Sequence, residues 1–282
     1  MGREPTRRMV ASREPDWRLR RRSGSVFGAV EPWEAIALAL AGFAAGAVNA
    51  VAGGGSLISF PALLLVGYPA KAANVTNTVA LWPGYASGSW AYREELRRQG
   101  GRIARLLPVS LAGALLGSVL LLSTPASTFE AMVPYLIYFA TGTLLFQEQL
   151  ARLAERHRLR ATHAEHLPAA VHLAVLALAV YGAYFGAGLG IMLLAVLLVL
   201  LPDDIQHANA LKGLISAIVN SVAVLWFLLF GPVRFAAAGA TAAGALLGGY
   251  VGVGIARRLG PRWLRLAVAA YGTVVATVYL LR

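Results

Sequence analysis

Residues 53–77 read GGGSLISFPALLLVGYPAKAANVTN, and residues 188–212 read GLGIMLLAVLLVLLPDDIQHANALK. Each stretch opens on glycines, continues through a short apolar run and reaches an Ala-Asn pair at the same internal distance. Asn209 follows Asn74 by 135 positions, which is also the distance between the starts of the two stretches. Because glycines release the backbone from a helix, the stretches predict two interrupted hydrophobic elements in a chain built from two repeats. In secondary transporters, binding sites lie where such interruptions meet.

The chain is too apolar for a soluble domain of its size. Of its 282 residues, 58% are hydrophobic and 13% are charged, which is typical of a polytopic membrane protein. The net charge is +12, but the arginines cluster in the first 22 residues and at 93–105, 152–160 and 257–265. Clusters between apolar segments indicate membrane orientation rather than nucleic-acid binding. The chain contains no cysteine, so disulfides and thiolate metal sites are excluded.

Ten apolar segments follow one another along the chain, five in each half. The second and seventh are too short to cross a hydrocarbon core of about 30 Å, because a helix needs roughly 20 residues to do so. We predict that these two are half-helices or re-entrant arms. The segments are 33–51, 56–66, 75–92, 103–122, 131–146, 169–185, 189–201, 210–230, 235–256 and 263–281.

The repeat extends beyond the glycine motifs. The hexapeptide AGALLG occurs at 112–117 and again at 243–248, and its small residues predict close helix packing, as do the Gly42-x-x-x-Gly46 and Gly248-x-x-x-Gly252 patterns. Arginine-rich loops are expected on the cytoplasmic side. This rule places 93–102, 152–160 and 257–262 inside, and 123–130 and 231–234 outside.

The loop after the third segment is then inside, whereas its counterpart after the eighth is outside. The expected fold is therefore an all-α polytopic membrane protein of two inverted five-segment repeats, with broken or re-entrant half-helices meeting near the midplane. Strict symmetry places the N-terminus outside, which conflicts with its arginines, and the sequence leaves this choice open. The expected regions are a basic, disordered tail (1–32), a first transmembrane repeat (33–147), a basic cytoplasmic linker (148–168) and a second transmembrane repeat (169–282).

The glycine motifs are candidate anion sites. A helix that restarts after Gly53, Gly54 and Gly55, or after Gly188 and Gly190, presents unpaired N–H groups and the positive end of its dipole. Ser56 can cap the first of these helices or donate to a bound oxygen. The alternative interpretation is a tight turn or close helix packing.

Polar residues after the short segments form a second candidate group. The first half contributes Asn74, Thr76 and Asn77 to this group, and the second half contributes Asn209 and Lys212. Asn209 occupies the position equivalent to Asn74, and Lys212 occupies the position equivalent to Asn77. Amides and a lysine are costly in hydrocarbon and usually face a cavity, another helix or the interface. Capping of the third and eighth segments by Asn74 and Asn209 is the alternative.

The sequence lacks the residues that several kinds of chemistry require. No Asp or Glu lies inside an apolar segment, which argues against a carboxylate proton relay, and the five histidines lack metal spacing. A serine intramembrane hydrolase using Ser56 or Ser216 with His172 or His207 remains an alternative without support from spacing. We expect no cofactor, no metal and no catalytic residue; a coupling ion, proton or sodium, is undetermined.

The motif Gly46-x6-Gly53-Gly-Gly-x5-Pro61-x5-Gly67, with Ala73-Asn74-x-Thr76-Asn77, resembles the TauE/SafE family of sulfite exporters. The stretch 181–190 (YGAYFGAGLG), followed by 207–212 (HANALK), does so as well. The resemblance covers the chain from about Trp33 to the C-terminus. It implies a secondary transporter, not an enzyme, that moves sulfite or short organosulfonates such as sulfoacetate across the cytoplasmic membrane.

The residues and the resemblance together predict alternating access around an anion held by the glycine motifs and the Asn and Lys donors. The expected partners are the small anionic substrate and the lipid bilayer, without nucleic acid, and a homodimer is left open. An anion channel is the leading alternative function. The predicted binding set is Gly53, Gly54, Gly55, Ser56, Asn74, Thr76, Asn77, Gly188, Gly190, Asn209 and Lys212.

Overall fold

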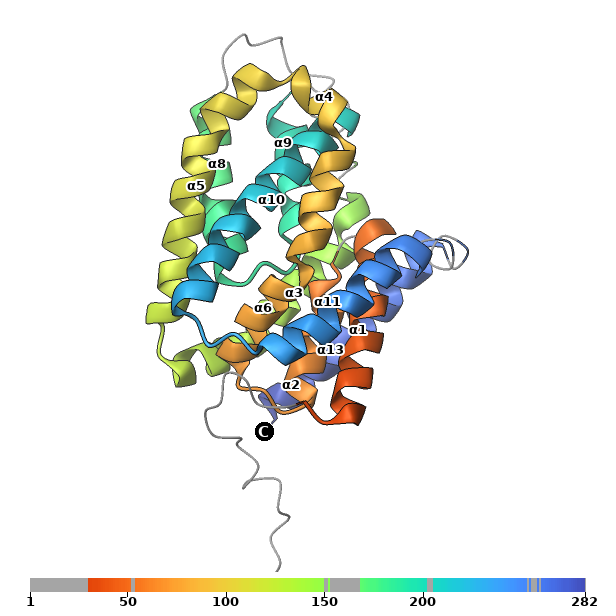
Figure 1. Cartoon of the computed structure of the whole chain (residues 1–282). Helices are drawn as coiled ribbons and strands as arrows, with labels where there is room; N and C mark the ends of the chain where they lie inside the picture. The colour runs from red at the N-terminus through yellow and green to blue at the C-terminus, as the bar shows by residue number, and fades with distance from the viewer. Residues whose placement is uncertain are drawn as a thin grey trace, which may run out of the picture.

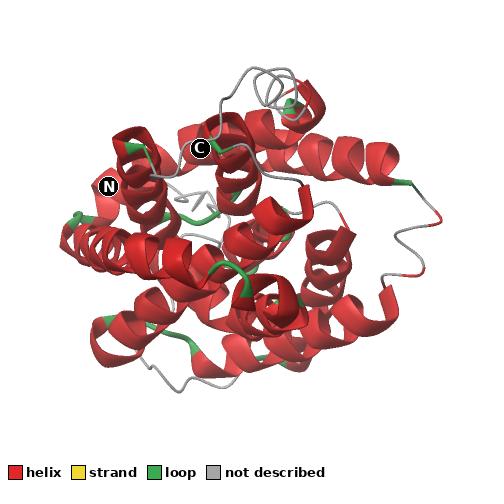
Figure 2. Cartoon of the chain, turned by 90° about the horizontal axis from the view of Figure 1, so that it is seen from above, coloured by secondary structure: helices red, strands yellow, loops and turns green. Residues whose placement is uncertain are grey.

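A computed structural model describes residues 30–51, 54–149, 152, 168–201, 205–252, 254, 258 and 260–281. These residues form helices joined by short connections, and none of them lies in a strand (Figure 2). The elements are α1 (Pro32–Val51), α2 (Ser56–Leu65), α3 (Ala70–Ala91), α4 (Arg93–Arg97), α5 (Gly100–Ser123), α6 (Ala126–Leu145), α8 (Ala169–Tyr184), α9 (Leu189–Leu200), α10 (Ile205–Phe230), α11 (Phe235–Leu247), a π-helical turn (Gly248–Gly252) and α13 (Pro261–Leu280).

The described helices differ in length, and α2 and α9 are two of the short ones. Four of the described helices are both long and apolar enough to cross a membrane, namely 32–50, 100–123, 205–230 and 262–280. By contrast, α2 has 10 residues and α9 has 12, which is about half the length that a bilayer requires. The second and seventh segments are therefore short helices, and their half-helix or re-entrant course in the membrane stays a prediction.

Two helix starts differ from the apolar segments. The third and eighth segments begin at Val75 and Ala210, whereas α3 begins at Ala70 and α10 at Ile205. Hydrophobicity misses the polar first turn of each helix. Asn74 and Asn209 therefore lie in the second turn, where a side chain cannot cap the helix start, and Pro69 is the N-cap of α3.

The two halves of the chain are interlocked. Figure 1 shows α11, in blue, beside α1, in red, and these helices touch through glycines. A Cβ on Gly46 would lie 2.0 Å from the Ala245 carbonyl oxygen, and one on Gly248 would lie 1.9 Å from that of Phe43. Only glycine permits so close an approach of two backbones. The predicted packing role of these glycines is confirmed.

The helices α5 and α8 form the corresponding pair, drawn in yellow and green in Figure 1. A Cβ on Gly113 would lie 2.7 Å from the Leu176 carbonyl oxygen, and one on Gly117 would lie 2.2 Å from that of Val180. The repeated hexapeptide thus performs the same task twice. In each half, the hexapeptide holds the fourth apolar segment against the first helix of the other half.

Equivalent helices of the two halves run in opposite directions where they meet. Along the α3–α10 contact, Trp82 Nε1 donates to Ser221 Oγ at 2.8 Å, while Ser89, about two turns later, lies beside Gly213. Because the partner numbers fall as the α3 numbers rise, the two helices are antiparallel. The same holds for α6 and α13, where Tyr138 pairs with Thr277 and Glu148 with Arg265.

The ends of the helices sort to two ends of the molecule. In Figure 1, α4 and the start of α5 lie at the top, while the turns from α5 to α6 and from α10 to α11 lie at the bottom with the C-terminus. The start of α1 is also at the bottom. The first described residues therefore lie at the end opposite the arginine-rich α4, as strict symmetry requires.

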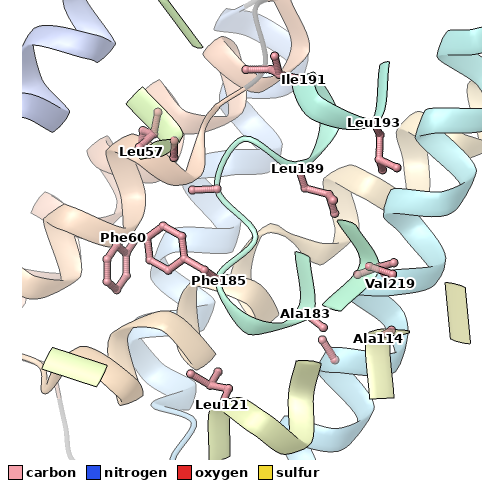
Figure 3. Packing of buried hydrophobic residues seen from close by; sticks show 14 of the residues in the cluster. Leu57, Phe60, Ala114, Leu121, Ala183, Phe185, Leu189, Ile191, Leu193 and Val219 are labelled. Atoms are coloured by element: carbon pink, nitrogen blue, oxygen red, sulfur yellow. The ribbon is translucent and has the colours of Figure 1, made fainter. Parts of the chain in front are cut away.

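The apolar core connects both half-helices. Phe60 of α2 packs edge-on against Phe185, which follows α8, with ring centroids 5.3 Å apart (Figure 3). Leu57 of α2 and Leu189 and Leu193 of α9 are buried in the same cluster. This packing fixes the two chain interruptions next to each other in the interior.

Candidate functional site

A cavity of about 880 Å³ opens between α1, α2, α3, α9 and α10 and the end of α11. Both glycine interruptions reach it, since Gly54 and Ser56 line it from one half and Gly188 and Gly190 from the other. The structure thus brings the two motifs together, as the repeat predicts. The polar side chains that line the cavity belong to Asn49, Ser56, Tyr85, Ser87, Ser89, Tyr92, Gln147, Asn209, Lys212, Ser216 and Tyr250.

The start of α9 lines this cavity with Gly188, Leu189, Gly190 and Ile191. Gly188 has φ +80°, which favours glycine, and a Cβ there would also lie 2.8 Å from Thr143 Oγ1. The N–H groups of Ile191 and Met192 donate to the Gly188 carbonyl at 3.0 and 3.1 Å. Within the described residues the Gly190 N–H has no hydrogen-bond partner, so it is available to a ligand at the positive end of the helix dipole.

Lys212 is the cation nearest to this helix start. Its Cδ lies 3.9 Å from the position that a Cβ on Gly190 would occupy, and its Nζ donates to Asn209 Oδ1 at 3.1 Å. Asn209, Lys212 and Ser216 stand three and four residues apart and share one face of α10. Among the described ion pairs none involves Lys212, which leaves its charge without a carboxylate partner.

Ser216 is a donor that the sequence indicated only as a hydrolase nucleophile. Its side chain is 3% exposed and lines the cavity, yet its Oγ has no hydrogen-bond partner among the described atoms. Helical serines elsewhere return the hydroxyl to the carbonyl one turn earlier, as Ser110, Ser118 and Ser221 do at 2.7–2.8 Å. A buried hydroxyl without this bond indicates a ligand position. The sequence signal for Ser216 is its position four residues after Lys212, which puts both side chains on one face of a helix.

The start of α2 is built differently. Gly54 has φ +86°, and a Cβ on Gly55 would lie 2.4 Å from the Ala45 carbonyl oxygen, so α2 packs directly on α1. Ser56 does not cap α2; its side chain lies beside the Tyr85 hydroxyl. The Asn49 side chain lies beside the same hydroxyl. Tyr85 was not singled out from the sequence, because a lone tyrosine in a long helix carries no pattern. Gly53 lies outside the described residues.

The other predicted polar residues do not line the cavity. Asn74 Nδ2 donates to the Tyr184 carbonyl at 2.9 Å, while the Thr76 hydroxyl accepts from the Arg234 N–H at 3.0 Å. Asn77 Oδ1 accepts from the Ser59 hydroxyl at 2.5 Å. These bonds connect α3 to the end of α8, to α2 and to the turn before α11, so Asn74, Thr76 and Asn77 surround the interruptions rather than face the cavity.

The charge of the cavity wall is positive. Among its described residues, Lys212 is the one Lys or Arg, and there is no Asp, Glu or His. No group of three or more potential metal ligands occurs within the described part of the chain. The wall can therefore offer hydrogen-bond donors, one cationic ammonium and two helix N-termini to a small anion.

Comparisons with known proteins agree with these features. The family model described as sulfite exporter TauE/SafE matches residues 38–279. A Haemophilus influenzae protein named probable membrane transporter protein is 28% identical over 224 residues, covering 79% of this chain and 86% of its own. The Escherichia coli K12 probable membrane transporter protein YfcA is 24% identical over 239 residues, covering 84% and 86%. No solved structure matches the chain significantly.

Proposed function

We propose that this chain, which belongs to the TauE/SafE family and is a multi-pass membrane transporter, moves sulfite or short organosulfonates such as sulfoacetate by alternating access. The observation that carries the proposal is the position of Lys212. It stands in a cavity without a described carboxylate, beside the free N–H of Gly190. A half-buried cation of this kind is compensated when an anion binds.

A sulfite or sulfonate group suits this cavity because its oxygens accept several hydrogen bonds from different directions. Lys212 Nζ, Gly190 N–H and Ser216 Oγ are donors that α9 and α10 contribute to the cavity wall. The proposed direct binding set is Gly54, Ser56, Gly188, Gly190, Asn209, Lys212 and Ser216, with Gly55 shaping the α2 start, while Gly53 lies outside the described residues. Asn74, Thr76 and Asn77 take a supporting position, since each is already hydrogen-bonded to another element.

The inverted repeat is the proposed basis of transport. It is supported by the antiparallel course of α3 against α10 and of α6 against α13, each pair being equivalent in the two halves. The glycine contacts join α1 to α11 and α5 to α8. We therefore propose which parts of the protein move as rigid bodies during transport. Each rigid body contains one helix pair drawn from both halves of the sequence, α1 with α11 or α5 with α8, together with a half-helix, and the two sequence halves do not move as units.

Transport by purified protein in lipid vesicles tests the proposal. Labelled sulfite or methanesulfonate should enter saturably, and an excess of unlabelled anion on the far side should accelerate the exchange. Lys212→Gln and Asn209→Ala should reduce this flux, whereas vesicles without protein should show none. Flux that does not saturate or exchange would favour a channel, and flux of neither anion would refute the substrate class.

A further inference from the structure

The cavity has a second polar cluster with no charge. The Tyr85 hydroxyl lies beside the side chains of Ser56 and Asn49, so three helices, α3, α2 and α1, each contribute one residue to this cluster. Ser56 is 6% exposed, and all three residues line the cavity. Two hydroxyls and an amide can both donate and accept hydrogen bonds. This group, the Tyr85 cluster, therefore suits an uncharged polar group of a bound molecule.

The cavity offers nothing that compensates a positive charge. No carboxylate is among its described lining residues, and its neutral acceptors include Gln147 Oε1, which has no described partner. Glu94 and Glu148, at the arginine-rich end, pair with Arg97 and Arg265. Asp203 and Asp204 lie outside the described residues. Lys212 and the starts of α2 and α9 add a positive field. A buried ammonium group would be repelled there and left without an anionic partner.

We propose that the site selects anions that carry no ammonium group, with the acidic head at Lys212 and a hydrogen-bonding tail without positive charge at the Tyr85 cluster. The proposal rests on the proposed function and makes it more specific. The volume supports it, since about 880 Å³ is far larger than one sulfite ion needs. Hydroxyalkyl sulfonates fit both clusters, whereas aminoalkyl sulfonates fit only the first.

Isethionate and taurine form a matched pair of probes. Both are two-carbon sulfonates, and they differ in a terminal hydroxyl on isethionate against a terminal ammonium on taurine. Binding to the purified full-length protein is measured by calorimetry or thermal shift at neutral pH. We expect isethionate to bind at least about tenfold more tightly, because taurine would bury an uncompensated charge. Equal affinity for the two would overturn the proposal.

A carboxylate placed at either cluster gives the matched variants. Asn49→Asp converts the amide beside Tyr85 into a carboxylate of the same shape, and the taurine-to-isethionate affinity ratio should rise about tenfold or more. Asn209→Asp makes the same change beside Lys212, and it should weaken both ligands without raising that ratio. An unchanged ratio in folded Asn49→Asp protein, or an equal rise in both variants, would contradict the placement of the tail.

A further variant separates the tail from the head. Tyr85→Phe removes only the hydroxyl, so it should lower the preference for isethionate over ethanesulfonate about threefold to tenfold and leave methanesulfonate binding unchanged. Failure of the wild type to bind sulfite, methanesulfonate and isethionate would refute the proposed function itself. Binding of these anions together with equal taurine binding would refute only the selection against ammonium.

Discussion

The Lys212 side chain lies against the start of α9, with its Cδ 3.9 Å from the position of a Cβ on Gly190. The contact joins the only Lys or Arg of the described cavity wall to the helix end whose Gly190 N–H is free within the described residues. Neither feature alone defines an anion site. Together they provide a point charge and a directional donor, which is the combination that an oxyanion prefers.

Replacement of Lys212 should separate binding from folding. Lys212→Gln removes the charge while keeping a polar side chain of similar length, and sulfite or methanesulfonate affinity should fall about tenfold to a hundredfold. Thermal stability without ligand should stay the same or rise, because a half-buried charge without an ion-pair partner among the described residues is lost. Lys212→Arg should retain part of the affinity. Wild-type affinity in Lys212→Gln would rule out this lysine as a ligand.

Gly190 tests whether the ligand approaches the backbone. A Cβ at this position meets Lys212 Cδ only at ordinary contact distance, so Gly190→Ala should fold. The added methyl group should nevertheless crowd an anion at the N–H and weaken methanesulfonate binding severalfold. Gly142→Ala in α6 is the matched control, since no atom lies within 4 Å of its Cβ position. Equal binding by the two variants would argue against direct use of the Gly190 N–H.

Ser216 gives a prediction with opposite signs for stability and binding. Ser216→Ala removes a buried hydroxyl that has no described partner, so stability without ligand should not fall. Anion affinity should fall about threefold to tenfold, the value of one hydrogen bond to a charged ligand. Ser118→Ala removes a hydroxyl that is bonded to the Ala114 carbonyl, and it should leave binding unchanged. The two measurements are denaturation in detergent and ligand titration.

The sequence predicts the elements better than it predicts their partners. Segment lengths reveal α2 and α9 as short helices, since length is a local property. The pairing of α1 with α11 is not local, because the hexapeptide at 243–248 identifies a packing face without saying which helix covers it. Asn77 and Lys212 occupy equivalent positions in the two repeats. Asn77 nevertheless bonds to Ser59, whereas Lys212 lines the cavity. Equivalent positions need not keep equivalent side-chain environments.

The candidate site was predictable in its glycines and its lysine but not in the Tyr85 cluster. Glycine interruptions and a lysine in apolar sequence are conspicuous because both are costly there. Tyr85, Ser56 and Asn49 come from three helices, and only the packing of α2 on α1 at Gly55 brings them together. No spacing rule within one helix connects them.

The glycine contacts between mixed helix pairs give a stability prediction. Gly46→Ala places a Cβ 2.0 Å from the Ala245 carbonyl oxygen, and Gly117→Ala places one 2.2 Å from that of Val180. The helices must separate to admit the methyl group, so each variant should lose about 1–3 kcal/mol of stability. Gly142→Ala should lose none. Similar melting curves for all three variants in detergent would show that these contacts are not tight in the folded protein.

The absence of cysteine from the chain allows a clean test of sidedness. Arg98 directly follows α4, whereas Ser127 lies in the first turn of α6 and Glu31 directly precedes α1, and all three are exposed. Figure 1 shows α4 at one end of the molecule and the starts of α1 and α6 at the opposite end. The arginine rule places the α4 end in the cytoplasm. A membrane-impermeant maleimide added to intact cells should therefore label Ser127→Cys and Glu31→Cys but not Arg98→Cys.

Labelling of Ser127→Cys without labelling of Glu31→Cys would show that α1 does not cross the membrane in the direction that inverted symmetry requires. The competing outcome follows from the eight arginines before residue 23, which favour an internal N-terminus; the experiment therefore decides whether helix packing or the charge of the tail sets the orientation of α1.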